Sequence, residues 1–149
     1  MIILITDEKK SINRCIYHLS RLVESRYKMK MEIIEDSEFH TIILTDDKAA
    51  SHICPCDSCN MYWMKNSELN DIDINKDDIK IEPYISYTHK HLGIKPRQIG
   101  RVITHKPSGV HSSCQAKRDG AENEAIAIDT LKLKLAAGYI DPPEPYLTI

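Results

Sequence analysis

Histidine and cysteine residues close together in the chain could bind a metal ion. His52, Cys54, Cys56 and Cys59 stand in the order H-x-C-x-C-x-x-C. Thiolate and imidazole ligands in such a cluster suit tetrahedral zinc. Against zinc, the C-x-C spacing is tight, Pro55 stiffens it, and structural zinc sites usually draw their ligands from two separated pairs. We therefore expect no bound zinc and interpret the segment as a loop with reduced thiols.

A second group of residues combines two histidines with positive charge, and its members are His89, Lys90, His91, Lys95, Arg97 and Arg101. Histidines beside a lysine could serve as acid and base in RNA cleavage. The same charges could instead bind phosphate. We favour binding because positive charge needs less exact placement than acid–base catalysis. His89 and His91 are kept as the only catalytic candidates.

The net charge of −2 conceals a division along the chain. Residues 1–88 carry a net charge of −5, residues 89–134 carry +5, and residues 135–149 carry −2. A basic segment on an otherwise acidic protein fits a polyanionic partner such as RNA. A solvated basic face without a partner explains the charge equally well.

Composition and length narrow the class of protein. The chain has 149 residues, which predicts one domain or two small lobes that share a core. It contains no apolar run of 18 residues, so no membrane span is expected. The apolar start, residues 1–5, precedes charged residues, which is the reverse of a signal peptide. We expect a cytoplasmic protein with neither a membrane partner nor a small-molecule cofactor.

Hydrophobic spacing predicts a β-α-β-β lobe at residues 1–64. Residues 2–6, 30–35 and 41–45 are short apolar runs typical of strands. Between the first two runs, apolar residues recur at the spacing of one helical face, after a candidate cap at Ser11. These residues are Ile12, Cys15, Ile16, Leu19, Leu22 and Val23. One helix across a small sheet is an α+β arrangement.

The remainder of the chain predicts a second α+β unit. Residues 65–78 are polar and rich in Asn and Asp, which indicates a linker. Strands are expected near 79–85, 101–105 and 110–115, followed by a helix over about 121–136 that ends at Gly138. Its expected apolar stripe consists of Ala125, Ile128, Leu131 and Leu135. The unit spans residues 79–138, and residues 139–149 form a Pro-rich tail.

The second unit carries an ordered set of short motifs. They are Asp78-Ile79-Lys80-Ile81-Glu82, then Val102-Ile103-Thr104-His105-Lys106-Pro107-Ser108-Gly109-Val110, then Cys114-Gln115, Lys117-Arg118 and Asn123. In this order and spacing the motifs resemble the hydrolase domain of class-I peptide chain release factors, where the first of them is a strand. The resemblance implies that Lys117, Arg118 and Asn123 lie near ribosomal RNA or order the preceding loop. It also implies a structural hydrogen bond from His105 within its turn.

The family's Gly-Gly-Gln motif falls, without a gap, on Lys90-His91-Leu92. In the family the two glycines permit a backbone shape that reaches the peptidyl transferase centre, since glycine lacks a Cβ. The glutamine helps to place the water that attacks the ester of peptidyl-tRNA. Leu92 can neither donate nor accept a hydrogen bond through its side chain. We therefore expect the hydrolytic centre to be missing.

The β-α-β-β lobe resembles the short, release-factor-H type members of the family, and Ile53-Cys54-Pro55 matches one of their motifs. So small a lobe leaves little room for a domain that reads stop codons. We expect a protein that binds the ribosome on the A-site side of the large subunit, through Lys90, Lys95, Arg97, Arg101, Lys117 and Arg118. It would act as a translation regulator, a rescue accessory or a blocker of another factor.

Two alternatives stay open. Hydrolysis would persist if His89 or His91 positioned water in place of the glutamine, which would make the chain a peptidyl-tRNA hydrolase or ribosome-rescue factor. The chain would otherwise be an RNA- or protein-binding module that acts away from the ribosome and keeps only the scaffold.

Elemental analysis of protein purified without chelator tests the metal expectation. We expect less than stoichiometric zinc. About one zinc per chain, lost in the Cys56→Ser variant, would contradict this expectation and would make the His-Cys cluster a folding element.

Overall fold

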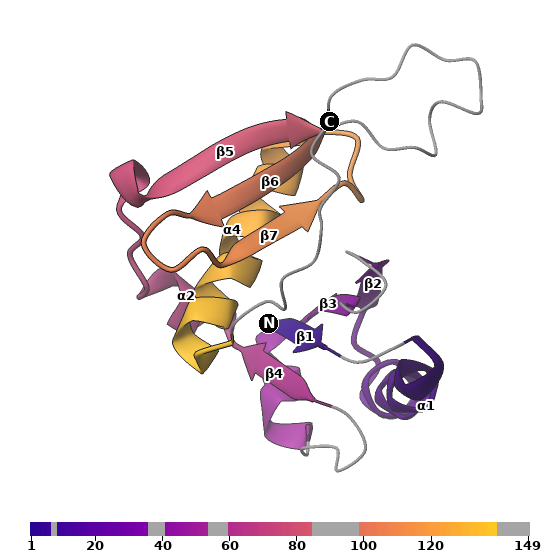
Figure 1. Cartoon of the computed structure of the whole chain (residues 1–149). Coiled ribbons are helices and arrows are strands. Elements are labelled where there is room, and N and C mark those ends of the chain that lie inside the picture. Colours follow the sequence, from indigo (N-terminus) through magenta and orange to yellow (C-terminus); the bar gives the residue numbers. More distant parts are fainter. Residues whose placement is uncertain (7–8, 36–40, 54–59, 85–98, 140–149) are drawn as a thin grey trace, which may run out of the picture.

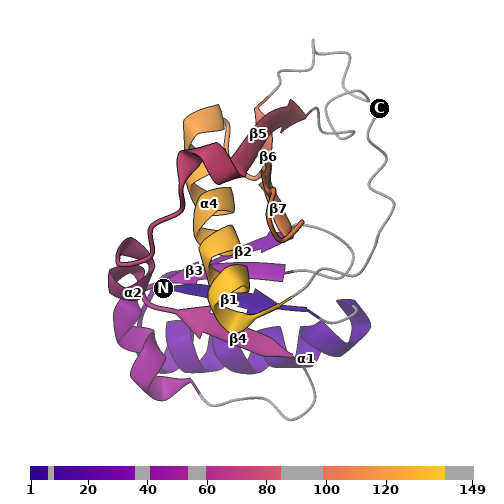
Figure 2. The ribbon, with the colours of Figure 1, turned by 60° about the vertical axis from the view of Figure 1, so that its left-hand side comes forward.

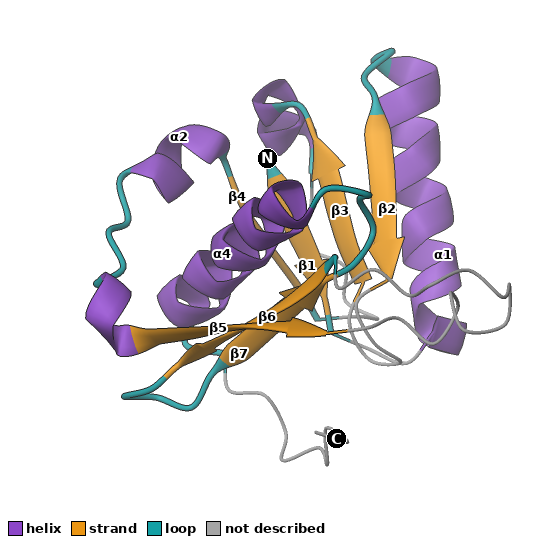
Figure 3. Ribbon diagram, turned by 90° about the horizontal axis from the view of Figure 1, so that it is seen from above, coloured by secondary structure: helices purple, strands orange, loops and turns teal. Residues whose placement is uncertain are grey.

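The computed structural model describes residues 1–6, 9–35, 41–53, 60–84 and 99–139 (Figure 1). Two antiparallel sheets and two long helices form four layers. Helix α1 (Lys9–Ser20) covers one face of the first sheet, and α4 (Gly120–Ala137) lies between that sheet and the second (Figure 3). This architecture confirms the predicted α+β class.

The first sheet has the strand order β2-β3-β1-β4. Its strands are β1 (Ile2–Ile5), β2 (Met31–Glu35), β3 (Thr41–Thr45) and β4 (Met61–Met64). The central β1 is buried on both faces, because Ile3 and Ile5 pack toward α1 while Ile2 and Leu4 pack toward α4. This double burial explains the unbroken apolar run at the start of the sequence. Strand β4 was not predicted.

Helix α1 continues into a π-helical turn, η1 (Arg21–Arg26). Cys15 and Leu19 of α1 and Val23 of η1 are buried and pack on the first sheet, which confirms these members of the predicted helical face. The side chain of Ile12, also predicted for this face, lies outside the described residues. The predicted cap is wrong: α1 begins at Lys9, so Ser11 lies inside the helix. A 3₁₀ helix, η2 (Asp47–His52), follows β3.

The second sheet has the order β5-β6-β7 and matches the predicted strands to within about one residue. Its strands are β5 (Ile79–Tyr84), β6 (Gly100–His105) and β7 (His111–Cys114). The turn between β6 and β7 contains Gly109 at φ +75°, a left-handed conformation that favours glycine. His105 Nδ1 lies 2.7 Å from Ser108 Oγ, which confirms the expected hydrogen bond within this turn.

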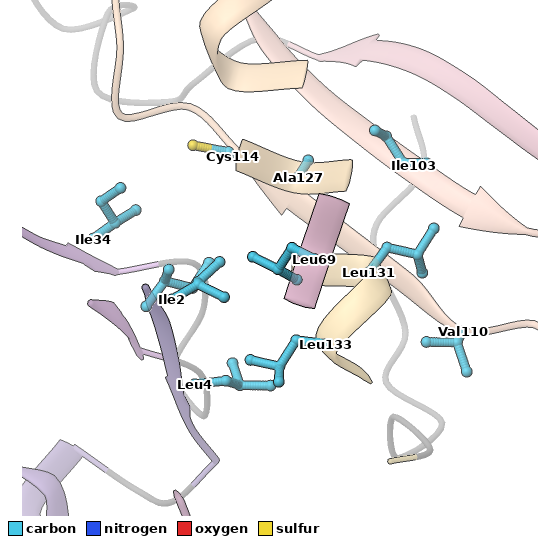
Figure 4. Packing of buried hydrophobic residues seen from close by; sticks show 11 residues of the cluster. Ile2, Leu4, Ile34, Leu69, Ile103, Val110, Cys114, Ala127, Leu131 and Leu133 are labelled. Carbon is cyan, nitrogen blue, oxygen red and sulfur yellow. The ribbon is translucent and has the colours of Figure 1, made fainter. Parts of the chain in front are cut away.

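Helix α4 ends at Gly138, as predicted, in a left-handed C-cap. Its predicted stripe is partly wrong, because Ala125 is exposed whereas Ala127, Leu131 and Leu133 are buried. The reason is that α4 contacts both sheets and therefore buries more than one side (Figure 4). No described helix is long and apolar enough to cross a membrane.

The segment 65–78, predicted as a linker, contains the short helix α2 (Asn66–Asn70) and the 3₁₀ turn η3 (Lys76–Asp78). Leu69 of α2 is 1% exposed and packs in the same cluster as Ile2, Ile103 and Leu131 (Figure 4). Lys132 of α4 donates to the Leu69 carbonyl at 3.1 Å. The residues of the two predicted lobes thus share one hydrophobic core.

Shortening a side chain in this shared core should destabilise the whole fold. We expect Leu131→Ala to lower the free energy of unfolding by about 2–5 kcal/mol, through lost burial and the cavity left behind. Ile33→Ala, on an edge strand where the side chain is 44% exposed, should cost about 1 kcal/mol or less. Denaturant titrations of both variants measure the difference, and equal losses would contradict a core centred on α4.

Candidate nucleic-acid interface

Three predicted site residues, Arg101, Lys117 and Arg118, lie near one end of the second sheet. There β5 ends at Tyr84, which pairs with Gly100 at the start of β6. Strand β7 ends at Cys114, opposite Arg101, and α4 begins nearby at Gly120. Segment 85–98, between β5 and β6, contains His89, Lys90, His91, Lys95 and Arg97, which lie outside the described residues.

Asn123 holds this end together. Its side chain is completely buried, and Nδ2 donates to the carbonyls of Ile99 at 2.8 Å and of Lys117 at 2.9 Å. Its Oδ1 accepts from the Lys117 amide at 2.9 Å and from the Cys114 thiol at 3.4 Å. Asn123 thus ties Ile99, which precedes β6, to β7 and to the turn before α4. A completely buried amide cannot contact RNA, so within the described residues Asn123 has a structural role.

Arg101 lies at the N-terminal end of α4. Its guanidinium donates to the Gly100 carbonyl at 3.0 Å and lies against Gly120, so a Cβ at position 120 would collide with it. The first turn of a helix presents the positive end of the helix dipole. Asp119 caps this turn and Glu122 lies in it, so their carboxylates offset the positive charge of Arg101 and of the helix dipole.

Lys117 forms an ion pair within the molecule. Its Nζ lies 2.5 Å from Glu32 Oε1 on β2, so the turn before α4 is tied to the first sheet. This hydrogen bond to Glu32 raises the pKa of Lys117 above its ordinary value of 10.5. The lysine is therefore charged at physiological pH, and the pairing is lost only as pH rises through the raised pKa. Arg118, the next residue, is exposed.

His105 does not join this group. It lies at the far end of β6, where it pairs with Ile79 at the start of β5. The residues of the resemblance are therefore divided between a turn at one end of the sheet and the Asn123 network at the other.

The zinc candidates lie elsewhere, next to the first sheet. His52 ends η2, and its ring stacks on Tyr27 with centroids 3.8 Å apart. Cys54, Cys56 and Cys59 lie outside the described residues. Within the described ranges, no group of three or more His, Cys, Asp or Glu residues could hold a metal ion. Zinc binding stays a matter for the elemental analysis.

Sequence inspection missed two residues that shape the interface. Asp119 caps α4, since its Oδ1 accepts from the Ala121 amide at 3.0 Å. A signal existed for it: Asp119 and Glu122 stand at the spacing of a capping box. Glu32, the partner of Lys117, carried no such signal, because the two residues are far apart in sequence.

Comparison with known proteins finds release factors. The chain is 33% identical over 78 residues to peptide chain release factor 1 of Pelobacter propionicus; the aligned segment covers 52% of this chain and 22% of that protein. The chain is 34% identical over 65 residues to peptide chain release factor 2 of Pseudothermotoga lettingae; this aligned segment covers 44% of this chain and 18% of that protein. No protein-family model matches the chain.

A solved structure agrees in fold. RF2 of Thermus thermophilus matches with a TM-score of 0.60 and 12% identity, covering 97% of this chain and 54% of that one. The homologues of this chain are thus peptide chain release factors 1 and 2, over about half its length and about a fifth of theirs.

Removing the Asn123 amide should loosen this end of the sheet. We expect Asn123→Ala to lower the free energy of unfolding by about 2–4 kcal/mol, because the carbonyls of Ile99 and Lys117 and the Lys117 amide lose their partner. Denaturant unfolding measures the loss. The matched control is Asn13→Ala on the exposed face of α1, which should leave stability nearly unchanged. A loss no larger than that of the control would show that the network contributes little.

Proposed function

We propose that this chain is a release-factor-like protein that binds the ribosome near the peptidyl transferase centre without releasing the peptide. The homology to release factors 1 and 2 supports the claim that the chain is a release-factor-like translation protein. The matched segments cover only about a fifth of those relatives, so the activity of the whole relatives does not transfer with them.

The charge of the interface supports RNA as the contacted surface. Segment 85–98 contains Lys90, Lys95 and Arg97, and it joins β5 to β6, which contains Arg101. Exposed Arg118 lies in the turn before that helix. Lys117 forms an ion pair with Glu32. We therefore propose that Lys117 positions this turn and does not bind RNA.

The sequence lacks the parts that peptide release requires. None of its five glycines is adjacent to another, so the 149 residues contain no Gly-Gly pair and no Gly-Gly-Gln. Attack on an ester needs a group that positions water and a loop that fits beside the tRNA terminus. Leu92 supplies no hydrogen-bonding group, and Lys90 and His91 lack the backbone freedom of glycine.

We therefore expect no peptide release above background from peptidyl-tRNA on ribosomes, with or without a stop codon in the A site. The assay measures released peptide against a release factor as positive control. Robust release that disappears in His91→Ala would contradict the proposal and favour the histidine-based hydrolase.

Ribosome association should survive and should depend on charge. We expect the purified protein to sediment with ribosomes or their large subunits, and less so as salt increases, because each phosphate contact releases counterions. Lys95→Glu with Arg97→Glu should strongly reduce the bound fraction without changing the unfolding midpoint.

Lys65→Glu with Lys76→Glu is the matched control, since both lysines are exposed and lie in the acidic part of the chain. If the two double variants bound ribosomes equally well, the loop would not be part of the interface. Sedimentation with neither particle would exclude the ribosome as partner.

A further inference from the structure

The outer face of α1 and η1 is basic, although it lies in the acidic part of the chain. Residues 9–30 contain seven Lys or Arg and a single acidic residue, Glu24, a net charge of +6. The apolar side of α1 and η1 is buried in the core, where Cys15, Leu19 and Val23 pack. Arg14, Arg21 and Arg26 are all exposed. This layer lies on the side of the first sheet opposite α4 and the second sheet (Figure 2).

Aromatic rings orient two of these arginines. Arg21 lies over the ring of Tyr17 at 5.6 Å and donates to its hydroxyl at 3.2 Å, and Tyr17 is itself 57% exposed. Arg26 lies over Tyr27 at 5.5 Å, and Tyr27 stacks on His52. A guanidinium held against a ring loses less freedom when it binds a phosphate, and Arg suits phosphate geometry.

An open groove lies beside η1 and is lined also by residues of β2 and β3. Its charged and aromatic lining consists of Tyr27, Lys28, Lys30 and Lys48 with the acidic residues Glu24, Glu32 and Asp46. The three lysines are exposed, and Lys28 adopts φ 56°, an uncommon conformation for a residue with a side chain. The acids have partners within the protein: Glu32 pairs with Lys117, Glu24 accepts from the Ser20 hydroxyl at 3.1 Å, and Asp46 accepts from the Lys48 amide at 2.9 Å. The groove carries as many acids as lysines, so the positive charge of this side comes mainly from the exposed arginines of α1 and η1.

We propose that α1 and η1, with Lys28 that follows them, form a second RNA-binding surface, which contacts the phosphate backbone through Arg14, Arg21, Arg26 and Lys28. Arg14 and Arg21 stand two helical turns apart, roughly 10 Å along the axis, so they reach different phosphates. A membrane surface fits less well, because a helix that lies on a bilayer needs an exposed apolar face, and here that face is buried. The inference rests on the proposed RNA binding and adds a contact separate from segment 85–98.

Fluorescence anisotropy with a labelled 20-base-pair RNA hairpin tests this surface, in about 50–200 mM KCl. Three double variants are compared: Arg14→Gln with Arg21→Gln, Lys95→Gln with Arg97→Gln, and the control Lys65→Gln with Lys76→Gln. We expect the first to weaken binding by roughly tenfold to thirtyfold at 0.1 M salt and to reduce the salt slope by about 1.4–1.8, as two lost phosphate contacts predict. The control should change affinity less than about twofold.

The outcomes separate this inference from the proposed function. Both surfaces would be supported if the helix variant and the loop variant each lost affinity for the hairpin and these losses added in the combined variant. A helix variant that behaves like the control overturns the second surface alone, and a loop variant that does so overturns the loop alone. Wild-type protein that binds neither the hairpin nor ribosomes overturns both. Dependence on Arg14 and Arg21 for phosphatidylserine vesicles but not for the hairpin would reassign the face to membranes. Circular dichroism confirms that each variant is folded.

Discussion

Helix α4 has to bury side chains on more than one side, because it lies between two sheets that have little other contact. Ala127, Leu131 and Leu133 fill the core from these sides. The same position buries polar groups, and each finds an internal acceptor. Thr130 donates to the Ile126 carbonyl at 2.8 Å, and the completely buried Lys134 donates to the His111 carbonyl at 2.7 Å. Without α4 each sheet would expose an apolar face, so the helix makes one cooperative unit of the two lobes.

The start of α4 organises the candidate interface for the same reason. Asn123 can hold Ile99 and Lys117 only because the helix carries it into the interior. The ion pair of Lys117 with Glu32 then connects this end to the edge strand β2 of the first sheet. The residues that hold Ile99 and the turn before α4 thus also join the two sheets.

Charge is distributed by layer rather than by lobe. The outer helix α1 is basic although the residues around it in sequence are acidic, and residues 89–134 carry the other excess of positive charge. The net charge of −2 conceals both basic segments, because acidic residues elsewhere in the chain outnumber them.

Local patterns in the sequence were enough to determine the strands of the second sheet, the bounds of α4, the turn at Gly109 and the absence of Gly-Gly-Gln, because strand alternation, helix capping and glycine chemistry act over a few residues. Tertiary structure decided the rest. Strand β4 forms because it pairs with the edge of β1. Ala127, and not Ala125, is buried in the core because α4 packs against both sheets. The burial of Asn123 and the pairing of Lys117 with Glu32, 85 residues away, depend on contacts between distant segments, which no local spacing encodes.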